Sequence, residues 1–188
     1  MKYLQIIVLC EGESDAIYLD IIFKMLKEKN PDINFKFTSI PIKGKTNFRD
    51  EKYIDKVEKI KLKFQGESQV LYVVDTDDVD ISKEDLELLE KIAEYVKKQD
   101  WHFVFFNRDI EEVLNKKADR KKKVNEARSY TKKKFNEVDK NNLKVKNYLT
   151  RGTSNFFSVI IEKLEMKIQQ VFKKTFHILY EKFFCDIK

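Results

Sequence analysis

Four short apolar runs, spaced along the first 106 residues, constrain the fold of this chain more than any other feature. The first run, YLQIIVLC, is continuous and rich in β-branched residues, which is typical of a central parallel strand covered on both faces. The second run alternates apolar and polar residues and closes at Pro41, so it is expected nearer the edge of the sheet. The predicted strands span residues 3–10, 33–42, 69–75 and 101–106.

Between these runs the apolar residues follow helical spacing. Ser14 is positioned as the N-cap of the first helix, and Ser82 begins the third, with Glu84 and Asp85 in a first turn that suits the helix dipole. The predicted helices span residues 14–29, 51–64 and 82–98. Strands that alternate with helices over short connections predict an α/β fold, Rossmann-like, with a mainly parallel sheet of about four strands flanked by helices. The apolar stripe expected on the first helix is formed by Ile17, Ile21, Ile22, Met25 and Leu26.

Beyond residue 110 the pattern becomes helical and basic. We therefore predict an α/β domain over residues 1–115 and a basic helical C-terminal extension over 116–188, packed on or beside it. Residues 116–134 hold ten basic side chains against two acidic ones, in a chain of net charge +6. Two interpretations of this run stay open: a solvated helical face, or a surface that binds nucleic acid, with Tyr130 available for stacking.

The last segment, from about residue 154, has the apolar spacing of one or two amphipathic helices. Its aromatic residues are expected to pack on the sheet or on a second copy of the chain, and they include Phe172, Phe176, Tyr180, Phe183 and Phe184.

Targeting and redox signals are weak in this sequence. The N-terminal apolar run stops at acidic residues without a small-residue cleavage site, so a signal peptide is not expected. No apolar stretch approaches the ~20 residues that cross a bilayer. The two cysteines, Cys10 and Cys185, do not make a disulfide framework. We expect a cytoplasmic protein without a membrane partner.

Acidic residues follow the first and third predicted strands. Glu11 ends the first strand, and Asp75 and Asp77 end the third. If the strands take the common order 2-1-3 with right-handed crossovers, these carboxyl ends are neighbours. Like charges so close raise one another's pKa, so a cation is expected, and oxygen ligands favour Mg²⁺ or Mn²⁺. Gly12 would leave room for another backbone or a phosphate.

Two motifs carry a resemblance to a known family. The stretch EGESDAIYL after the first strand and VVDTDD after the third resemble the glutamate and DxD motifs of the Toprim domain, which topoisomerases, primases and several nucleases share. The loop GKTNF and the segment NRDIEEVL are similar, more narrowly, to the stand-alone OLD-like and RloB-like Toprim nucleases of bacterial defence systems. The resemblance covers roughly residues 4–115.

The resemblance implies a Mg²⁺-dependent phosphodiester chemistry, with Glu11 as general acid or base and Asp75 and Asp77 as metal ligands. Glu11 is also a candidate ligand. The segment after the fourth strand is implied to add a carboxylate, for which Glu111 is preferred to Glu112. The residues expected to meet the phosphates of a substrate are Gly12, Lys43, Lys45, Lys121, Lys122 and Lys123.

Two functions from different classes stay open. The first is a Mg²⁺-dependent nuclease, a hydrolase of DNA or RNA in anti-phage defence, for which a separately encoded ATPase and a second copy of the chain are candidate partners. The second is a non-catalytic subunit that binds nucleic acid or regulates a larger complex. For Glu11 and the DTDD run the plain alternative is a strand-ending helix cap and a solvated turn. Haloacid-dehalogenase phosphatases are disfavoured, because their nucleophile follows the first strand whereas Asp75 follows the third. Receiver domains do carry a carboxylate after the third strand, but the acidic pair after the first strand and the Lys after a fifth strand that they need are not clearly present.

Overall fold

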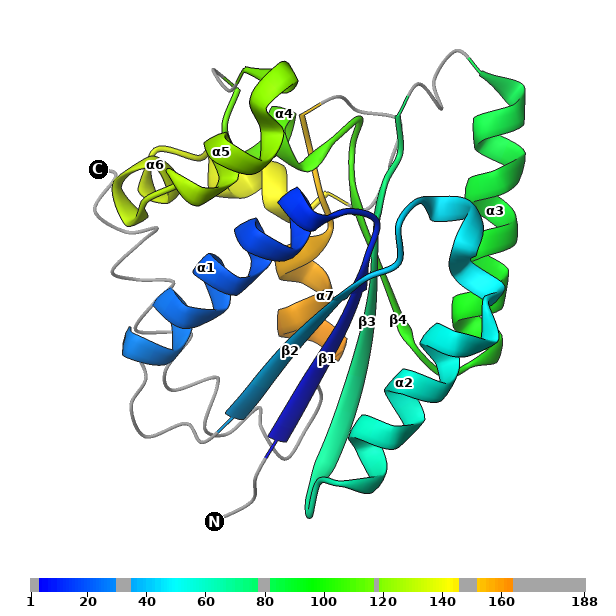
Figure 1. The fold of residues 1–188 in the computed structure, drawn as a ribbon. Coiled ribbons are helices and arrows are strands. Elements are labelled where there is room, and N and C mark those ends of the chain that lie inside the picture. The colour runs from blue at the N-terminus through cyan, green and yellow to red at the C-terminus, as the bar shows by residue number, and fades with distance from the viewer. Residues whose placement is uncertain (1–3, 30–34, 78–81, 117–118, 146–151, 164–188) are drawn as a thin grey trace.

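The computed structural model describes residues 4–29, 35–77, 82–116, 119–145 and 152–163 (Figure 1). Within them, four parallel strands form one sheet in the order β2-β1-β3-β4. The order of the first three strands and their parallel pairing confirm the prediction. β2 lies at one edge, as its alternating pattern indicated. The strands are β1 Leu4–Cys10, β2 Phe35–Pro41, β3 Glu67–Asp75 and β4 His102–Phe106.

Helices cover both faces of the sheet (Figure 1). One face packs against α2, Glu51–Leu62, and α3, Lys83–Lys98. Ser82 caps α3 as predicted, since its hydroxyl accepts a hydrogen bond from the Asp85 N–H at 3.2 Å. The other face carries α1 Glu13–Lys29, α4 Ile110–Leu114, α5 Lys123–Arg128, α6 Lys132–Asn136 and α7 Phe156–Lys163. Short 3₁₀ turns lie at Lys45–Arg49, Arg120–Lys122 and Lys140–Leu143.

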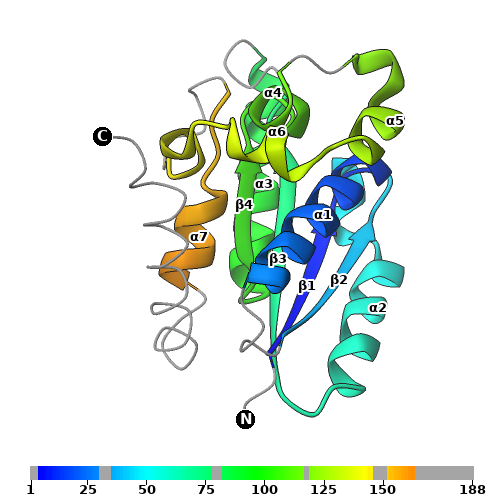
Figure 2. The ribbon, with the colours of Figure 1, turned by 90° about the vertical axis from the view of Figure 1, so that its left-hand side faces the viewer.

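The helix α1 is buried more widely than its predicted stripe. Tyr18, Leu19 and Phe23 are fully buried, whereas Ile17 and Ile21 are only partly covered. The reason is the chain beyond residue 119, because α5 and α6 pack against α1, above it in the view of Figure 2. A helix that is covered on two sides buries more than one stripe.

The basic C-terminal extension is made of short segments in its described part. Ala127, Phe135 and Leu143 belong to the same hydrophobic cluster as β1 and α1. In this region α7 packs beside β4 (Figure 2). The ring of Phe156 on α7 contacts the rings of Phe23 and Phe106. The predicted aromatic tail beyond residue 163 lies outside the described residues.

In the described residues, no helix combines the length and the apolar character that crossing a membrane requires.

Candidate active site at the carboxyl ends of the strands

Glu11 lies directly after β1, where the strand leaves the core. Burial, together with the charges of Asp77 and Asp15, raises the pKa of its carboxyl group to about 7, and Lys45 opposes the shift. Its Oε2 atom is buried without a hydrogen-bond partner among the described residues. The loop after β2 is held against it, since the Gly44 N–H donates to the Glu11 carbonyl at 3.0 Å. Glu11 is therefore a carboxyl group that can exchange a proton near neutral pH.

Asp75 ends β3 and is buried, with 8% of its surface exposed. Its Oδ1 accepts a hydrogen bond from the Ile110 N–H, at the start of α4, at 3.1 Å. Burial, followed by the charges of Asp15, Glu11 and Glu111, raises the pKa of Asp75 well above its usual range. This carboxylate is the centre of the acidic group, because every one of these neighbours acts on it.

Asp77 stands two residues beyond Asp75 with a left-handed backbone, φ 51°. Its carboxylate is half exposed and lies 2.5 Å from the Nζ atom of Lys45. The same ammonium group lies 3.1 Å from Asp85, in the first turn of α3. Lys45, predicted to meet substrate phosphates, is thus paired with two carboxylates of the protein itself.

Thr76, between the two aspartates, is buried and turned into the protein. Its hydroxyl accepts from the Arg108 N–H at 2.8 Å, and its own N–H donates to the Phe106 carbonyl at 3.0 Å. A further bond of 2.9 Å runs from the Asp77 N–H to the Arg108 carbonyl. The turns after β3 and β4 are therefore bound to each other.

Strained backbone gathers at the same edge of the sheet. Lys43, Asp77 and Arg108 have φ of 62°, 51° and 70°, and they follow β2, β3 and β4 respectively. A left-handed conformation costs a non-glycine residue of order 1–3 kcal/mol and clusters at functional sites. The fourth described non-glycine residue with a positive φ, Asp100 at 56°, lies at the opposite end of the sheet, before β4.

Glu111, on α4, is the most buried carboxylate of the site, with 1% of its surface exposed. Both carboxylate oxygens lack a hydrogen-bond partner among the described residues, and Lys123 Nζ forms an ion pair with Oε2 at 3.4 Å. Burial raises the pKa of Glu111, and Lys123 opposes the shift. Glu112 instead pairs with Arg108 at 3.5 Å near the surface. Of the two candidates, the structure therefore brings Glu111 to Asp75.

Asp15 is the site residue that the sequence analysis missed. It is buried in the first turn of α1, where its Oδ2 accepts from the Gly12 N–H at 2.8 Å and its Oδ1 from the Ser14 hydroxyl at 3.3 Å. Ser14 is therefore not the N-cap of α1 that the sequence predicted, because its hydroxyl donates a hydrogen bond to Asp15. The side chain that accepts the backbone N–H of Gly12 at the start of the helix is that of Asp15. Burial raises the pKa of Asp15. The available signal was its place one helical turn after Glu11, which returns its side chain to the strand end.

Gly12 does not make room for another backbone. A Cβ added there would meet Asp15 Oδ2 at 3.7 Å and Ser14 Oγ at 4.0 Å, which are ordinary contacts. The approach of a phosphate to Gly12 stays a prediction.

The remaining predicted substrate residues lie at the surface around this edge. Lys43 and Lys121 are exposed, and Lys122 lies 3.9 Å from Asp119 in a loose ion pair. Tyr130 is not available for stacking on a base. It is buried, its ring packs edge to face on Tyr18 at 4.9 Å, and its hydroxyl donates to the Leu114 carbonyl at 3.1 Å. Tyr130 lies in a lysine-rich stretch of the sequence, but it follows α5 with its ring pointing inward, onto α1.

The carboxylates divide between the two faces of the sheet. Along β1, Ile7 and Leu9 point to the α2 and α3 side, so Glu11 continues on that side, beside Asp77. Along β3, Leu71 and Val73 point to the α1 side, and Asp75 joins Asp15 and Glu111 there. Among the described residues, no three or more His, Cys, Asp or Glu side chains lie together so that they could hold a metal ion. The carboxylates interact across the strand ends without forming an assembled ligand set.

Taken together, these features define the class: an α/β protein with a parallel sheet and interacting buried carboxylates at its carboxyl edge. Comparison with protein-family models, with curated proteins and with solved structures finds no match to this chain.

Proposed function

We propose that this protein is a divalent-metal-dependent nuclease of the Toprim type that cleaves phosphodiester bonds in DNA or RNA. The observation that carries the proposal is a set of buried carboxylate oxygens that have no hydrogen-bond partner among the described residues: Oε2 of Glu11, after β1, and both oxygens of Glu111, on α4. Glu111 is paired with Lys123 at 3.4 Å, but buried carboxylate oxygens without hydrogen bonds remain costly, and a cation is their natural ligand.

The donors fit Mg²⁺ or Mn²⁺ in their chemistry, although they are not preassembled. All are carboxylates, and two ammonium groups, from Lys45 and Lys123, pair with Asp77 and Glu111 where a metal would supply charge. We propose that Asp75, Asp77 and Glu111, with Glu11 and Asp15 beside them, are the residues that would hold the metal in place of the ammonium groups of the two lysines. A bound metal would lower the pKa of a water and stabilise the charge of the phosphate.

Glu11 is proposed as the general acid or base. Its raised pKa, about 7, means that both protonation states are populated at neutral pH, which suits proton transfer to or from a phosphate ester. Lys45, once released from Asp77, is proposed to meet a phosphate oxygen of the substrate, as are the exposed Lys43 and Lys121. Each of these roles needs a substrate at the carboxyl edge of the sheet, where α/β proteins commonly bind their ligands.

The test is a calorimetric titration with Mn²⁺ together with a cleavage assay on DNA and RNA. Wild type should bind Mn²⁺ and cleave, and Asp75→Asn and Asp77→Asn should bind at least tenfold more weakly. Asp55→Asn, an exposed carboxylate on α2, is the matched control and should behave as wild type. Two results would contradict the nuclease assignment. One is a Glu11→Gln variant that cleaves as fast as wild type, and the other is a wild-type protein that cleaves neither DNA nor RNA in Mg²⁺ or Mn²⁺.

A second candidate is a non-catalytic subunit that binds nucleic acid. It is favoured by the pairing of Lys45 with Asp77 and Asp85, which already neutralises part of the acidic group. Binding of nucleic acid with a steep salt dependence, but no binding of Mn²⁺, would support it. For either function we keep the cytoplasm as the proposed location, and anti-phage defence, a separate ATPase and a homodimer as the proposed setting.

A further inference from the structure

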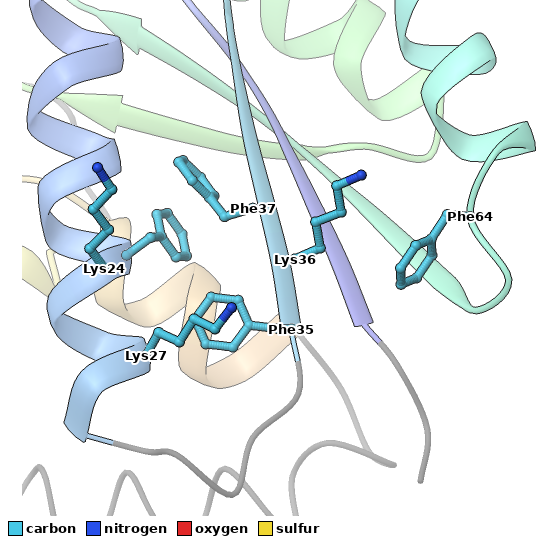
Figure 3. A pocket seen from close by; sticks show the side chains of 7 residues that line it. Lys24, Lys27, Phe35, Lys36, Phe37 and Phe64 are labelled. Atoms are coloured by element: carbon cyan, nitrogen blue, oxygen red, sulfur yellow. The ribbon is translucent and has the colours of Figure 1, made fainter.

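A pocket lies around the edge strand β2, at the end of the sheet opposite the carboxylates (Figure 3). Its volume is about 440 Å³, within the range of roughly 300–1,000 Å³ typical of small-ligand pockets. The strand β2 runs from Phe35 to Pro41, so at ~3.3 Å per residue roughly 20 Å separate the pocket from the acidic site. The lining residues are Phe23, Lys24, Lys27, Phe35, Lys36, Phe37 and Phe64.

Among the described residues, the lining combines aromatic rings with lysines and includes no acidic residue. Phe37 is partly buried and stacks on Phe23, with ring centroids 4.1 Å apart and an angle of 19° between the rings. Phe35 packs edge to face on Phe23 at 6.3 Å. The rings therefore form a rigid platform in which Phe37 is the member nearest to solvent.

Three exposed lysines surround this platform. Lys24 and Lys27 extend from α1 on the side of Phe37, and Lys36 extends from β2 on the other side, towards Phe64 (Figure 3). In the part of the chain that the structure describes, no carboxylate forms an ion pair with any of the three. Their charge is available to an anionic ligand on both sides of the strand.

We propose that this pocket binds a nucleotide of single-stranded nucleic acid, with a base against Phe37 and the flanking phosphates at Lys24, Lys27 and Lys36. A flat apolar ring beside several cations is the combination that single strands need, since every base has a face to stack and every nucleotide carries a phosphate. A duplex keeps its bases stacked inside and presents none of them to a concave pocket. The proposal rests on the proposed function for the choice of ligand, and it names the form of the substrate: a single strand, or a single-stranded end, held away from the site of cleavage.

An acidic peptide is the competing occupant. The outer edge of β2 has no partner strand among the described residues, so a peptide could add to it. The lysines alone would be enough to bind an acidic peptide, and the stacked rings of Phe37 and Phe23 would then have no role in binding. The aromatic platform therefore favours the nucleic acid.

The experiment measures binding of a fluorescent 20-nucleotide poly-dT or poly-U strand by anisotropy, in EDTA, so that cleavage does not intervene. The double variant Lys24→Glu/Lys27→Glu should weaken binding at least tenfold and make the salt dependence shallower by roughly 1.4 in the log–log slope, at about 0.7 for each phosphate that no longer meets a lysine. The matched control is Lys91→Glu/Lys98→Glu, two exposed lysines on α3, which should weaken binding much less.

Phe37→Leu separates stacking from charge. It keeps an apolar side chain on Phe23 but removes the ring, and it should weaken binding roughly tenfold, within the range expected when one stacking ring is removed. The lysine variants are exposed, so they report on the pocket even if Phe37→Leu lowers stability.

The proposal is overturned if the variants of Lys24 and Lys27 bind like the control pair, if a duplex of the same length binds as tightly as the single strand, or if poly-glutamate competes as well as poly-dT. If wild type cleaves nucleic acid but these variants bind the single strand as wild type does, the proposed role of the pocket is refuted and the proposed nuclease function stands. Binding that depends on the pocket, without cleavage in Mg²⁺ or Mn²⁺, would support the pocket and refute the nuclease.

Discussion

Replacing Glu11 by Gln should stabilise the protein above neutral pH. The carboxyl group of Glu11 has a pKa of about 7 in the folded protein against an ordinary value of 4.5. Between these two values the native state binds more protons than the unfolded state, so the stability of wild type falls as the pH rises. Below pH 4.5 the carboxyl group of Glu11 is mostly neutral in both the folded and the unfolded state. Above about pH 7 it is ionised in both states, and the folded protein bears the full free-energy cost of the ionised group.

The size of the effect follows from the same two values. The difference between these pKa values corresponds to roughly 3.5 kcal/mol, at about 1.4 kcal/mol per pH unit. We expect about 2 kcal/mol, because the side chain of Glu11 keeps some contact with solvent, which screens the charges of Asp77 and Asp15. The free energy of unfolding of the Glu11→Gln variant should thus exceed that of wild type by about 2 kcal/mol at pH 8 and equal it at pH 4.

Urea unfolding at a series of pH values measures this difference. Trp101, the single tryptophan, is buried between α3 and β4 and reports unfolding by its fluorescence. Glu13→Gln is the control, since Glu13 is exposed and paired with Arg128 at the surface, and it should leave the pH profile unchanged. Parallel profiles for wild type and Glu11→Gln between pH 4 and pH 8 would refute the account of Glu11 as a destabilised carboxylate.

Three further predictions concern the lysines and Tyr130. Lys123→Met should lower the free energy of unfolding at pH 8 by about 1–2 kcal/mol, because it leaves Glu111 buried without a cation. Adding Glu111→Gln to the same chain should restore most of the lost stability, as measured by urea unfolding. Lys45→Met should bind Mn²⁺ about tenfold more tightly by calorimetry, since the metal no longer competes with an ammonium group for Asp77, and binding unchanged from wild type would contradict the competition. Tyr130→Ala should destabilise the fold by about 3 kcal/mol in thermal or urea unfolding and Tyr130→Phe by about 1 kcal/mol, while Tyr130→Phe should bind nucleic acid as wild type does.

The sheet could be predicted from the sequence because its signals are local. The continuous apolar pattern of β1 and the alternation of β2 already separate a central strand from an edge strand. The order 2-1-3 with right-handed crossovers is an assumption, made because it is common in such folds, and it is the order that the structure has. That order brings Glu11 and Asp75 to adjacent strand ends. Their position follows from strand order alone and needs no knowledge of side-chain packing.

The rest of the site depends on packing between distant segments. Lys123 reaches Glu111 only because α5 docks beside α1, and a lysine-rich run gives no sign of which lysine turns inward. The same docking buries Tyr130, which the sequence places among solvent-facing residues. Asp15 was overlooked for a different reason: Ser14 is an equally good cap by residue type, and only the orientation of the first turn of α1 distinguishes them.

The balance of charge at the strand ends argues for a function rather than for a structural turn. Glu11, Asp15, Asp75 and Glu111 all have raised pKa values, with burial as the largest cause of each. A cap needs one carboxylate, and Asp15 already supplies it for α1. Each additional buried carboxylate lowers stability at neutral pH, and Lys45 and Lys123 offset only part of that cost. We propose that a positively charged ligand offsets this cost, since each of the four carboxyl groups is destabilised when it is ionised.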